Sequence, residues 1–99
     1  MTKNSLGPEF ARSWLLVNGT HTNRFRIAEN SQADSNVLDI EDGVAPNRKE
    51  EALANAVEWL STGHGAWVRI NGFGTEWWEK DCRELATCDG LQGVMLAMV

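Results

Sequence analysis

The sequence lacks a concentration of basic residues and a long apolar run. Nine lysines and arginines are scattered among fourteen aspartates and glutamates, and the formal net charge is −5. Binding to DNA or RNA needs clustered positive charge, so the composition argues against a nucleic-acid partner. No stretch approaches the ~18 apolar residues of a membrane span, which argues against a membrane protein.

The start of the chain and its few cysteines favour a cytoplasmic protein. Residues 1–10 contain one lysine and no apolar run, so they do not resemble a secretory signal. Cys82 and Cys88, the only cysteines, lie six residues apart on different faces of a predicted helix. Neither His21 nor His64 lies at zinc-ligand spacing from them. We therefore expect two reduced, partly buried thiols rather than a disulfide or a metal site.

Apolar segments and turn residues divide the chain into alternating strands and helices. Buried strands are predicted over 13–17, 36–40, 66–70 and 93–98, and helices over 23–30, 47–60 and 75–85. Residues 1–11 are predicted to be a flexible leader, and 12–99 to be one domain. Regular alternation implies parallel strands with right-handed crossovers. The βαβαβαβ pattern is therefore interpreted as α/β, either the N-terminal half of a (βα)8 TIM barrel or a very small open sheet.

The predicted helices differ in how they begin and in what they bury. Thr22 and Thr75 are expected to cap the first and third helices. The second helix carries apolar residues at helical spacing, and its residues 48–51 are assigned to the solvent side. These apolar positions are Ala52, Leu53, Ala56, Val57 and Leu60 in the second helix, and Trp78, Cys82 and Leu85 in the third.

Acidic and basic side chains follow two of the predicted strands. Because side chains alternate along a strand, Asp39 and Glu41 are expected to share one face of their strand, and Arg69 and Asn71 are expected to share one face of theirs. If the strands are parallel, these groups meet at the carboxyl ends, where sheets and barrels of this class bind ligands. The arrangement predicts a site that combines anionic metal ligands with a carboxylate clamp.

Each part of this site has a structural alternative. Asp39, Glu41 and Asp42 could hold Mg²⁺ directly or through water. Alternatively, Asp42 starts a turn while the other two carboxylates face solvent. Arg69 could bind a substrate carboxylate through two parallel hydrogen bonds, or form a structural ion pair with Asp39 or Glu41. The two roles of Arg69 are compatible, because an empty site can keep its arginine paired.

Other conspicuous residues favour structural interpretations. Gly72-Phe73-Gly74 lacks the lysine and hydroxyl of a P-loop and the third glycine of a dinucleotide-binding turn, so a simple turn is predicted. His64 and His21 are predicted in exposed turns. Trp77 and Trp78 lie on adjacent helix faces, so only one of them is expected in the core. No serine or cysteine lies in a context that identifies a nucleophile.

Four segments together resemble the HpcH/HpaI aldolase and citrate lyase β-subunit family. They are Arg12-Ser13-Trp14-Leu15-Leu16-Val17-Asn18-Gly19, Asp39–Val44 with Ala45-Pro46 and Lys49, Val68-Arg69-Ile70-Asn71, and Gly93-Val94-Met95-Leu96. Their order and spacing match from about Arg12 to the last residue. The resemblance implies a (βα)8 barrel that uses Mg²⁺ to cleave or form carbon–carbon bonds in acyl-CoA thioesters such as citryl-CoA or malyl-CoA. Some members of the family hydrolyse the thioester instead.

The resemblance also implies roles for individual residues. Arg69, with Asn71 beside it, would bind the carboxylate of an oxaloacetate- or glyoxylate-like 2-oxo acid. Glu41 and Asp42 would line the surroundings of the metal, and Gly19 would lie near the acyl-CoA entrance. Mg²⁺ would polarise the carbonyl, and enolate charge would be stabilised electrostatically. The family's direct metal ligands, a glutamate and an aspartate, lie on later strands and have no counterpart in this chain.

The sequence departs from the family pattern at three places. Asn18 replaces the proline of a Val-Pro-Gly motif, and Leu53 stands where an arginine follows the helix lysine. Leu96-Ala97-Met98 replaces a Leu-Pro-Lys motif, and this change removes a cation from the barrel interior.

Three classes of function are therefore considered. The first is a fragment of a Mg²⁺-dependent acyl-CoA carbon–carbon lyase, inactive alone because a closed barrel typically needs ~250 residues. The second is a non-catalytic half-barrel module that pairs with itself or with a separate C-terminal half, through exposed strands and Trp77 or Trp78. The third is a phosphoryl-accepting receiver-like domain, placed last because no lysine follows Lys80.

Overall fold

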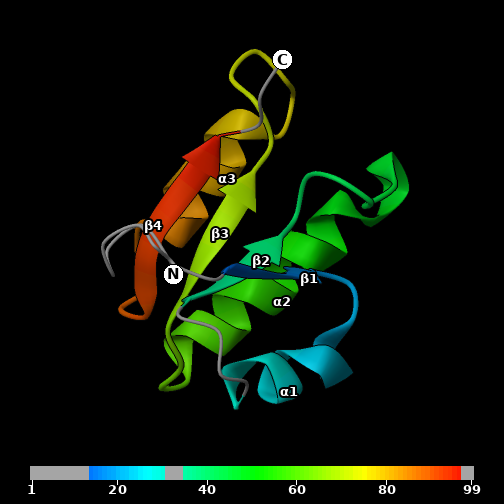
Figure 1. Ribbon diagram of the computed structural model, residues 1–99. Coiled ribbons are helices and arrows are strands. Elements are labelled where there is room, and N and C mark those ends of the chain that lie inside the picture. Colours follow the sequence, from blue (N-terminus) through cyan, green and yellow to red (C-terminus); the bar gives the residue numbers. More distant parts are fainter. Residues whose placement is uncertain (1–13, 31–34, 97–99) are drawn as a thin grey trace, which may run out of the picture.

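The computed structural model describes residues 14–30 and 35–96, which form a four-stranded sheet with helices packed on it (Figure 1). The strands are β1 (Trp14–Asn18), β2 (Ser35–Asp39), β3 (Ala66–Ile70) and β4 (Leu91–Leu96). The helices are α1 (Phe25–Glu29), α2 (Lys49–Ser61) and α3 (Trp78–Leu85), and short 3-10 turns η2 (Thr22–Arg24) and η3 (Pro46–Arg48) precede the first two. The predicted leader over 1–11 lies outside the described residues.

The strands lie in the order β1-β2-β3-β4, and all three neighbouring pairs are parallel. A helix connects each strand to the next, and Figure 1 shows α2 and α3 behind the strands. This arrangement confirms the predicted βαβαβαβ pattern. Parallel pairing brings the carboxyl ends of all four strands to one edge, where the predicted polar residues follow β2 and β3.

The core lies between the sheet and the helices. Helix α2 buries the predicted apolar stripe against it, and α3 adds buried Leu85 with partly buried Trp78 and Cys82. The buried residues that α2 contributes are Ala52, Leu53, Ala56 and Leu60. Cys82 and Cys88 are free thiols, and Cys82 is partly buried as predicted. Cys88 is buried and lies after the end of α3, so its predicted place on the helix is wrong. Burial raises the pKa of the Cys82 thiol.

The opposite face of the sheet is not covered by these helices. Leu38 and Val68 belong to the core cluster, so the alternation along β2 and β3 turns Asp39 and Arg69 to the other face. Trp14 and Trp67 pack edge to face at 5.4 Å between ring centroids. Several large apolar side chains on the two edge strands are exposed, namely Trp14, Leu15 and Leu16 on β1 and Val94 and Leu96 on β4.

Both predicted helix caps are wrong. No side chain caps η2 or α3, and α3 begins at Trp78 rather than Thr75. The hydroxyl of Thr75 instead donates to the carbonyl oxygen of Gly72 at 2.7 Å, which closes a turn before the helix. Within the described part of the chain, no helix combines the length and apolar character needed to cross a bilayer.

Candidate functional site

Asp39 and Arg69 are register partners at the ends of β2 and β3, and they form the centre of the site. Arg69 donates from Nε to Asp39 Oδ1 at 3.2 Å and from Nη2 to Oδ2 at 2.6 Å. The Asp39 residue is 6% exposed, whereas the Arg69 side chain keeps 28% of its surface accessible. The hydrogen bonds to Asp39 raise the pKa of Arg69 further above its usual range. Arg69 is therefore a fixed, permanently charged group that still faces solvent.

Asp39 also shapes the loop that follows β2. Its Oδ1 accepts hydrogen bonds from the backbone N–H groups of Glu41 and Asp42, both at 3.0 Å. This Asx-type turn brings two more carboxylates towards Arg69, Glu41 at 3.9 Å from Nε and Asp42 at 3.7 Å from Nη2. The sequence predicted this meeting of acids and arginine correctly. It was wrong about the cause, because β2 ends at Asp39 and the turn, not strand alternation, positions Glu41.

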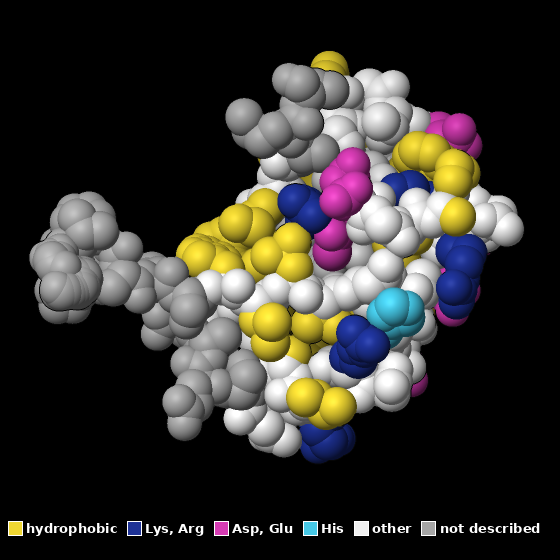
Figure 2. All heavy atoms as spheres, turned by 45° about the vertical axis from the view of Figure 1, so that its right-hand side comes forward, with side chains coloured by type: hydrophobic (Ala, Val, Ile, Leu, Met, Phe, Trp, Pro, Cys, Tyr) yellow, Lys and Arg dark blue, Asp and Glu magenta, His cyan; other side chains and the backbone are white. Residues whose placement is uncertain are grey.

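Within residues 14–30 and 35–96, the guanidinium of Arg69 has donors without a hydrogen-bond partner. Two of its five N–H groups donate to Asp39, and the carboxylates of Glu41 and Asp42 lie beyond hydrogen-bonding distance. Figure 2 shows a basic side chain among acidic ones on one side of the molecule, with apolar side chains next to them. A partly exposed arginine with free donors can bind an incoming carboxylate without losing its internal partner.

Asn71 does not share the open face with Arg69. Strand β3 ends at Ile70, and Asn71 is 3% exposed. Its side-chain amide donates to Asp81 Oδ2 at 2.7 Å and to the carbonyl oxygen of Ile40 at 3.3 Å. Asp81 Oδ2 also accepts from the backbone N–H of Asn71 at 3.2 Å. Asn71 therefore ties the ends of β2 and β3 to α3.

Gly19 allows β1 to approach α2 closely. A Cβ at Gly19 would lie 3.0 Å from the Cβ of Ala52 and 3.0 Å from the Cγ2 of Ile40. Its N–H donates to the carbonyl oxygen of Asp39 at 2.8 Å. Asn18, at the position of the family's proline, donates to the carbonyl oxygen of Gly43 at 3.0 Å. The end of β1 is thus joined to the acidic loop by two hydrogen bonds.

Lys49 is buried, which contradicts its assignment to the solvent side of α2. The residue is 8% exposed, and its Nζ donates to the carbonyl oxygens of Glu41 at 2.6 Å and Ile40 at 3.5 Å. The ammonium lies 5.2 Å from the ring centroid of Trp77. Lys49 and Asp81 are both functional candidates that the sequence analysis did not identify. Their positions on the buried stripes of α2 and α3 are the sequence signal that could have identified them.

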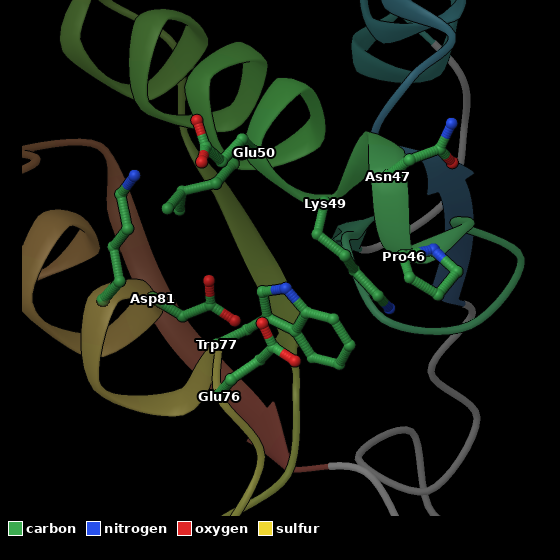
Figure 3. Close-up of a pocket in the computed structure, with 9 residues that line it drawn as sticks. Pro46, Asn47, Lys49, Glu50, Glu76, Trp77 and Asp81 are labelled. Atoms are coloured by element: carbon green, nitrogen blue, oxygen red, sulfur yellow. The ribbon is translucent and has the colours of Figure 1, made fainter.

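A cavity of about 490 Å³ lies between α2 and α3 on the outer side of the sheet (Figure 3). Its lining includes the buried Lys49 and Asp81, the indole of Trp77, and the more exposed Glu50 and Glu76. Figure 3 shows Trp77 lying between Asp81 and Lys49. The cavity therefore opens onto the polar groups that support the loop after β2, from the side opposite Arg69.

His64 is not the exposed turn residue that the sequence predicted. Its ring stacks on Trp59 at 3.6 Å between centroids, and Nδ1 lies 2.7 Å from Glu29 Oε2. The neighbouring glycines let the chain turn, while the ring packs back onto α2. His21 is exposed, as predicted.

The described residues contain no group of three His, Cys, Asp or Glu side chains that could hold a metal ion. The exposed fraction is 32% for the Glu41 side chain and 79% for that of Asp42. These two carboxylates fit a place near a bound cation, but they do not form a coordination sphere by themselves.

The burial of Asp81 makes a pH-dependent contribution to stability. Desolvation raises its pKa above the ordinary value of 3.8, although both hydrogen bonds from Asn71 oppose the shift. The folded state then holds this proton more tightly than the unfolded state, so the contribution of Asp81 declines as pH rises through the raised pKa. Asp81→Asn removes this decline. The variant should therefore gain stability relative to the wild type in urea unfolding as the pH rises through the interval above about pH 4. If the difference in unfolding free energy between Asp81→Asn and the wild type did not change across that interval, the burial of an ionisable Asp81 would be contradicted.

Comparison with known proteins identifies the family. The model of the HpcH/HpaI aldolase/citrate lyase family matches residues 12–99. The chain belongs to this family. Comparison with curated proteins gives no match.

Comparison with solved structures agrees with this assignment. CitE from Mycobacterium tuberculosis, in complex with magnesium, acetoacetate and coenzyme A, is 32% identical, with a TM-score of 0.73 over 87% of this chain and 32% of that one. The citrate lyase beta subunit of M. tuberculosis, complexed with oxaloacetate and magnesium, is 34% identical, with a TM-score of 0.71 over 84% and 36%. RipC from Yersinia pestis is 28% identical, with a TM-score of 0.55 over 78% and 29%.

The chain spans about a third of the length of these relatives. Their likeness covers most of the present chain, and the family model, which matches residues 12–99, includes all the elements that carry the site. The architecture is therefore the N-terminal half of a (βα)8 barrel, which was the first of the two predicted arrangements. This membership leaves no support for the receiver-like alternative.

Proposed function

We propose that this chain supplies the 2-oxo-acid-binding part of a Mg²⁺-dependent acyl-CoA carbon–carbon lyase site. The observation that carries the proposal is the Asp39–Arg69 pair at the strand ends, in which further N–H donors of Arg69 have no partner among the described residues. A guanidinium in this state binds a carboxylate through two parallel hydrogen bonds. The oxaloacetate bound to a 34% identical relative is a ligand of this chemical class.

In this proposal Asp39 orients Arg69 and Arg69 contacts the substrate. Asn71 and Gly19 support the site without contacting the substrate, because their polar groups are bonded to the backbone and to Asp81. Because Gly19 has no side chain, the end of β1 packs closely against α2 beside the acidic loop, and we propose that the acyl-CoA chain enters there. The relative that binds acetoacetate and coenzyme A supports a substrate made of these two parts.

Magnesium is proposed as the cofactor, because the related structures bind it together with a 2-oxo or 3-oxo acid. Bound magnesium would polarise the substrate carbonyl. Glu41 and Asp42 would face the cation through water, and residues outside this chain would supply its direct ligands. The free thiols of Cys82 and Cys88 are consistent with a reducing, cytoplasmic setting, which we propose for the activity.

Titration calorimetry with oxaloacetate, with and without Mg²⁺, tests the proposal. We expect a Kd of about 1 mM, because half of a binding site provides only about 4 kcal/mol. The dimethyl ester of oxaloacetate lacks the carboxylate charges and should not bind. No saturable heat with the free acid would refute the proposal. Turnover of citryl-CoA or malyl-CoA by the chain alone is expected to stay at background.

A second candidate function is a half-barrel module that associates with a second copy or with a C-terminal half. The observation that favours it is the exposure of apolar side chains on the edge strands, 46% for Leu16 and 56% for Leu96. Covering such side chains is a common reason for association. Sedimentation equilibrium decides this point, since a monomer at all concentrations would exclude self-association.

A further inference from the structure

We propose that Lys49 is a positioning residue for the loop that carries Glu41 and Asp42. The proposal rests on the function proposed above, because that function gives the loop its role. Lys49 begins α2, on the outer side of the sheet, whereas Arg69 lies on the inner side. The loop is therefore held between two cations, one on each side.

The contacts of Lys49 are directed at the backbone of the loop. Its Nζ donates to the carbonyl oxygen of Glu41 at 2.6 Å, the shorter of its two backbone contacts. The side chain is buried, and the ring of Trp77 lies 5.2 Å from the ammonium. Burying an ammonium is costly, and among the described residues no carboxylate lies within 4.0 Å of it. The two carbonyl oxygens compensate the buried charge at hydrogen-bonding distance, and the Trp77 ring and the Asp81 carboxylate, which line the same cavity, do so from further away.

A separate tie holds the residue before the loop. Asn71 donates to the carbonyl oxygen of Ile40, and Asp81 fixes the Asn71 amide. Lys49 also reaches the Ile40 carbonyl, at 3.5 Å, but its shorter hydrogen bond, at 2.6 Å, goes to the carbonyl oxygen of Glu41. The carbonyl of Ile40 therefore has two side-chain partners, whereas the carbonyl of Glu41 is held by Lys49, the amides of Glu41 and Asp42 by Asp39, and the far end of the loop, at Gly43, by Asn18.

Electrostatics explains why a cation is needed there. Asp39, Glu41 and Asp42 place three carboxylates around Arg69, with a single positive charge among them. Like charges this close repel one another. The ammonium of Lys49, beneath the same loop, offsets part of this repulsion. Without it, the carboxylates of Glu41 and Asp42 would move away from Arg69.

Hydrogen exchange of the full chain tests the proposal without any ligand. In Lys49→Met, the amides of Glu41 and Asp42, which are bonded to Asp39, should exchange at least about tenfold faster than in the wild type. Exchange of the Ala56 amide within α2 reports the change in global stability, which is subtracted. Leu53→Ala, one turn further along α2, lowers stability through the core and should leave the corrected loop exchange unchanged.

Equal corrected exchange in Lys49→Met and Leu53→Ala would overturn the proposal. Lys49→Arg keeps a cation and donors at this position and should restore at least part of the loop protection. If Lys49→Met does not fold, Lys49→Arg still tests the proposal. Corrected loop protection in Lys49→Arg below that in Leu53→Ala would then contradict the role of Lys49. If Lys49→Met lost loop protection but the wild type did not bind oxaloacetate, the proposed function alone would be refuted. Unchanged protection with a binding wild type would refute the role of Lys49 alone.

Discussion

Replacing Arg69 with methionine is expected to remove oxaloacetate binding. The substitution keeps the aliphatic stem but deletes all five N–H donors, including those that Asp39 leaves free. Hydrogen bonds to charged groups contribute about 1.5–3 kcal/mol each, so the loss of two should weaken binding by about a hundredfold or more. Starting from a millimolar Kd, calorimetry should detect no saturable binding in Arg69→Met.

Arg48→Met is the matched control for this experiment. It also removes one positive charge, but Arg48 pairs with Glu51 on the exposed surface of η3 and α2. Its effect on oxaloacetate binding should stay within about twofold, since exposed charges act weakly at a distance. Circular dichroism of both variants shows whether the fold persists. Equal binding by the two variants would mean that Arg69 does not contact the ligand.

Replacing Gly90 with alanine is expected to cause a large loss of stability. A Cβ at Gly90 would overlap the backbone carbonyl oxygen of His64 and lie 2.7 Å from that of Leu60. Gly90 also donates to the Leu60 carbonyl at 3.0 Å and accepts from Ala66 at 3.1 Å, so it is bonded to both segments that would have to move. Overpacking of this kind should cost about 3 kcal/mol or more in urea unfolding.

Gly72→Ala provides the comparison. Gly72 has no heavy atom within 4 Å of the position of an added Cβ, so its substitution should change stability by less than about 1 kcal/mol. The two glycines follow β3 and precede β4, in the same half of the sheet. If Gly90→Ala were as stable as Gly72→Ala, the close approach of the turn before β4 to the end of α2 would be incorrect.

The order of elements was predictable because the apolar periodicity is strong and local. The stripe of α2 and the short apolar runs of the strands depend only on neighbouring residues, and the structure confirms the stripe and the four strands. The predicted burial of the first and fourth strands is wrong, because β1 and β4 are edge strands with exposed apolar side chains, and residues 97 and 98 of the predicted fourth strand lie outside the described residues. The helix beginnings were not predictable in this way. Thr75 has a hydroxyl that can cap a helix or close a turn, and the carbonyl of Gly72 decides for the turn.

The site was predictable to the extent that it depends on strand ends. Alternation along each strand predicts the face on which Asp39 and Arg69 lie, and the parallel register of β2 and β3 places them side by side. The buried partners could not be read from the sequence, because each depends on contacts across the fold. Lys49 finds the carbonyl of Glu41 only after α2 has packed, and Asn71 turns inward only because Asp81 lies on α3. A charged residue on the apolar stripe of a helix indicates a buried charge, but the sequence does not show which group it contacts.

The same reasoning applies to His64. Two flanking glycines predict a turn, and the structure has one. The direction of the imidazole is decided by Trp59 and Glu29, which lie on other elements. Local sequence therefore predicted the backbone here and could not predict the packing of the side chain.

We propose above all that Arg69 binds a carboxylate at the carboxyl ends of β2 and β3 while it stays paired with Asp39. The most direct measurement is NMR of the arginine Nε–H groups in the ¹⁵N-labelled chain, with Arg69 assigned by its absence in Arg69→Met. Titration with oxaloacetate should shift the Arg69 Nε–H resonance in a saturable manner and leave that of Arg48 in place. A resonance of Arg69 that does not move at saturating oxaloacetate would contradict the account.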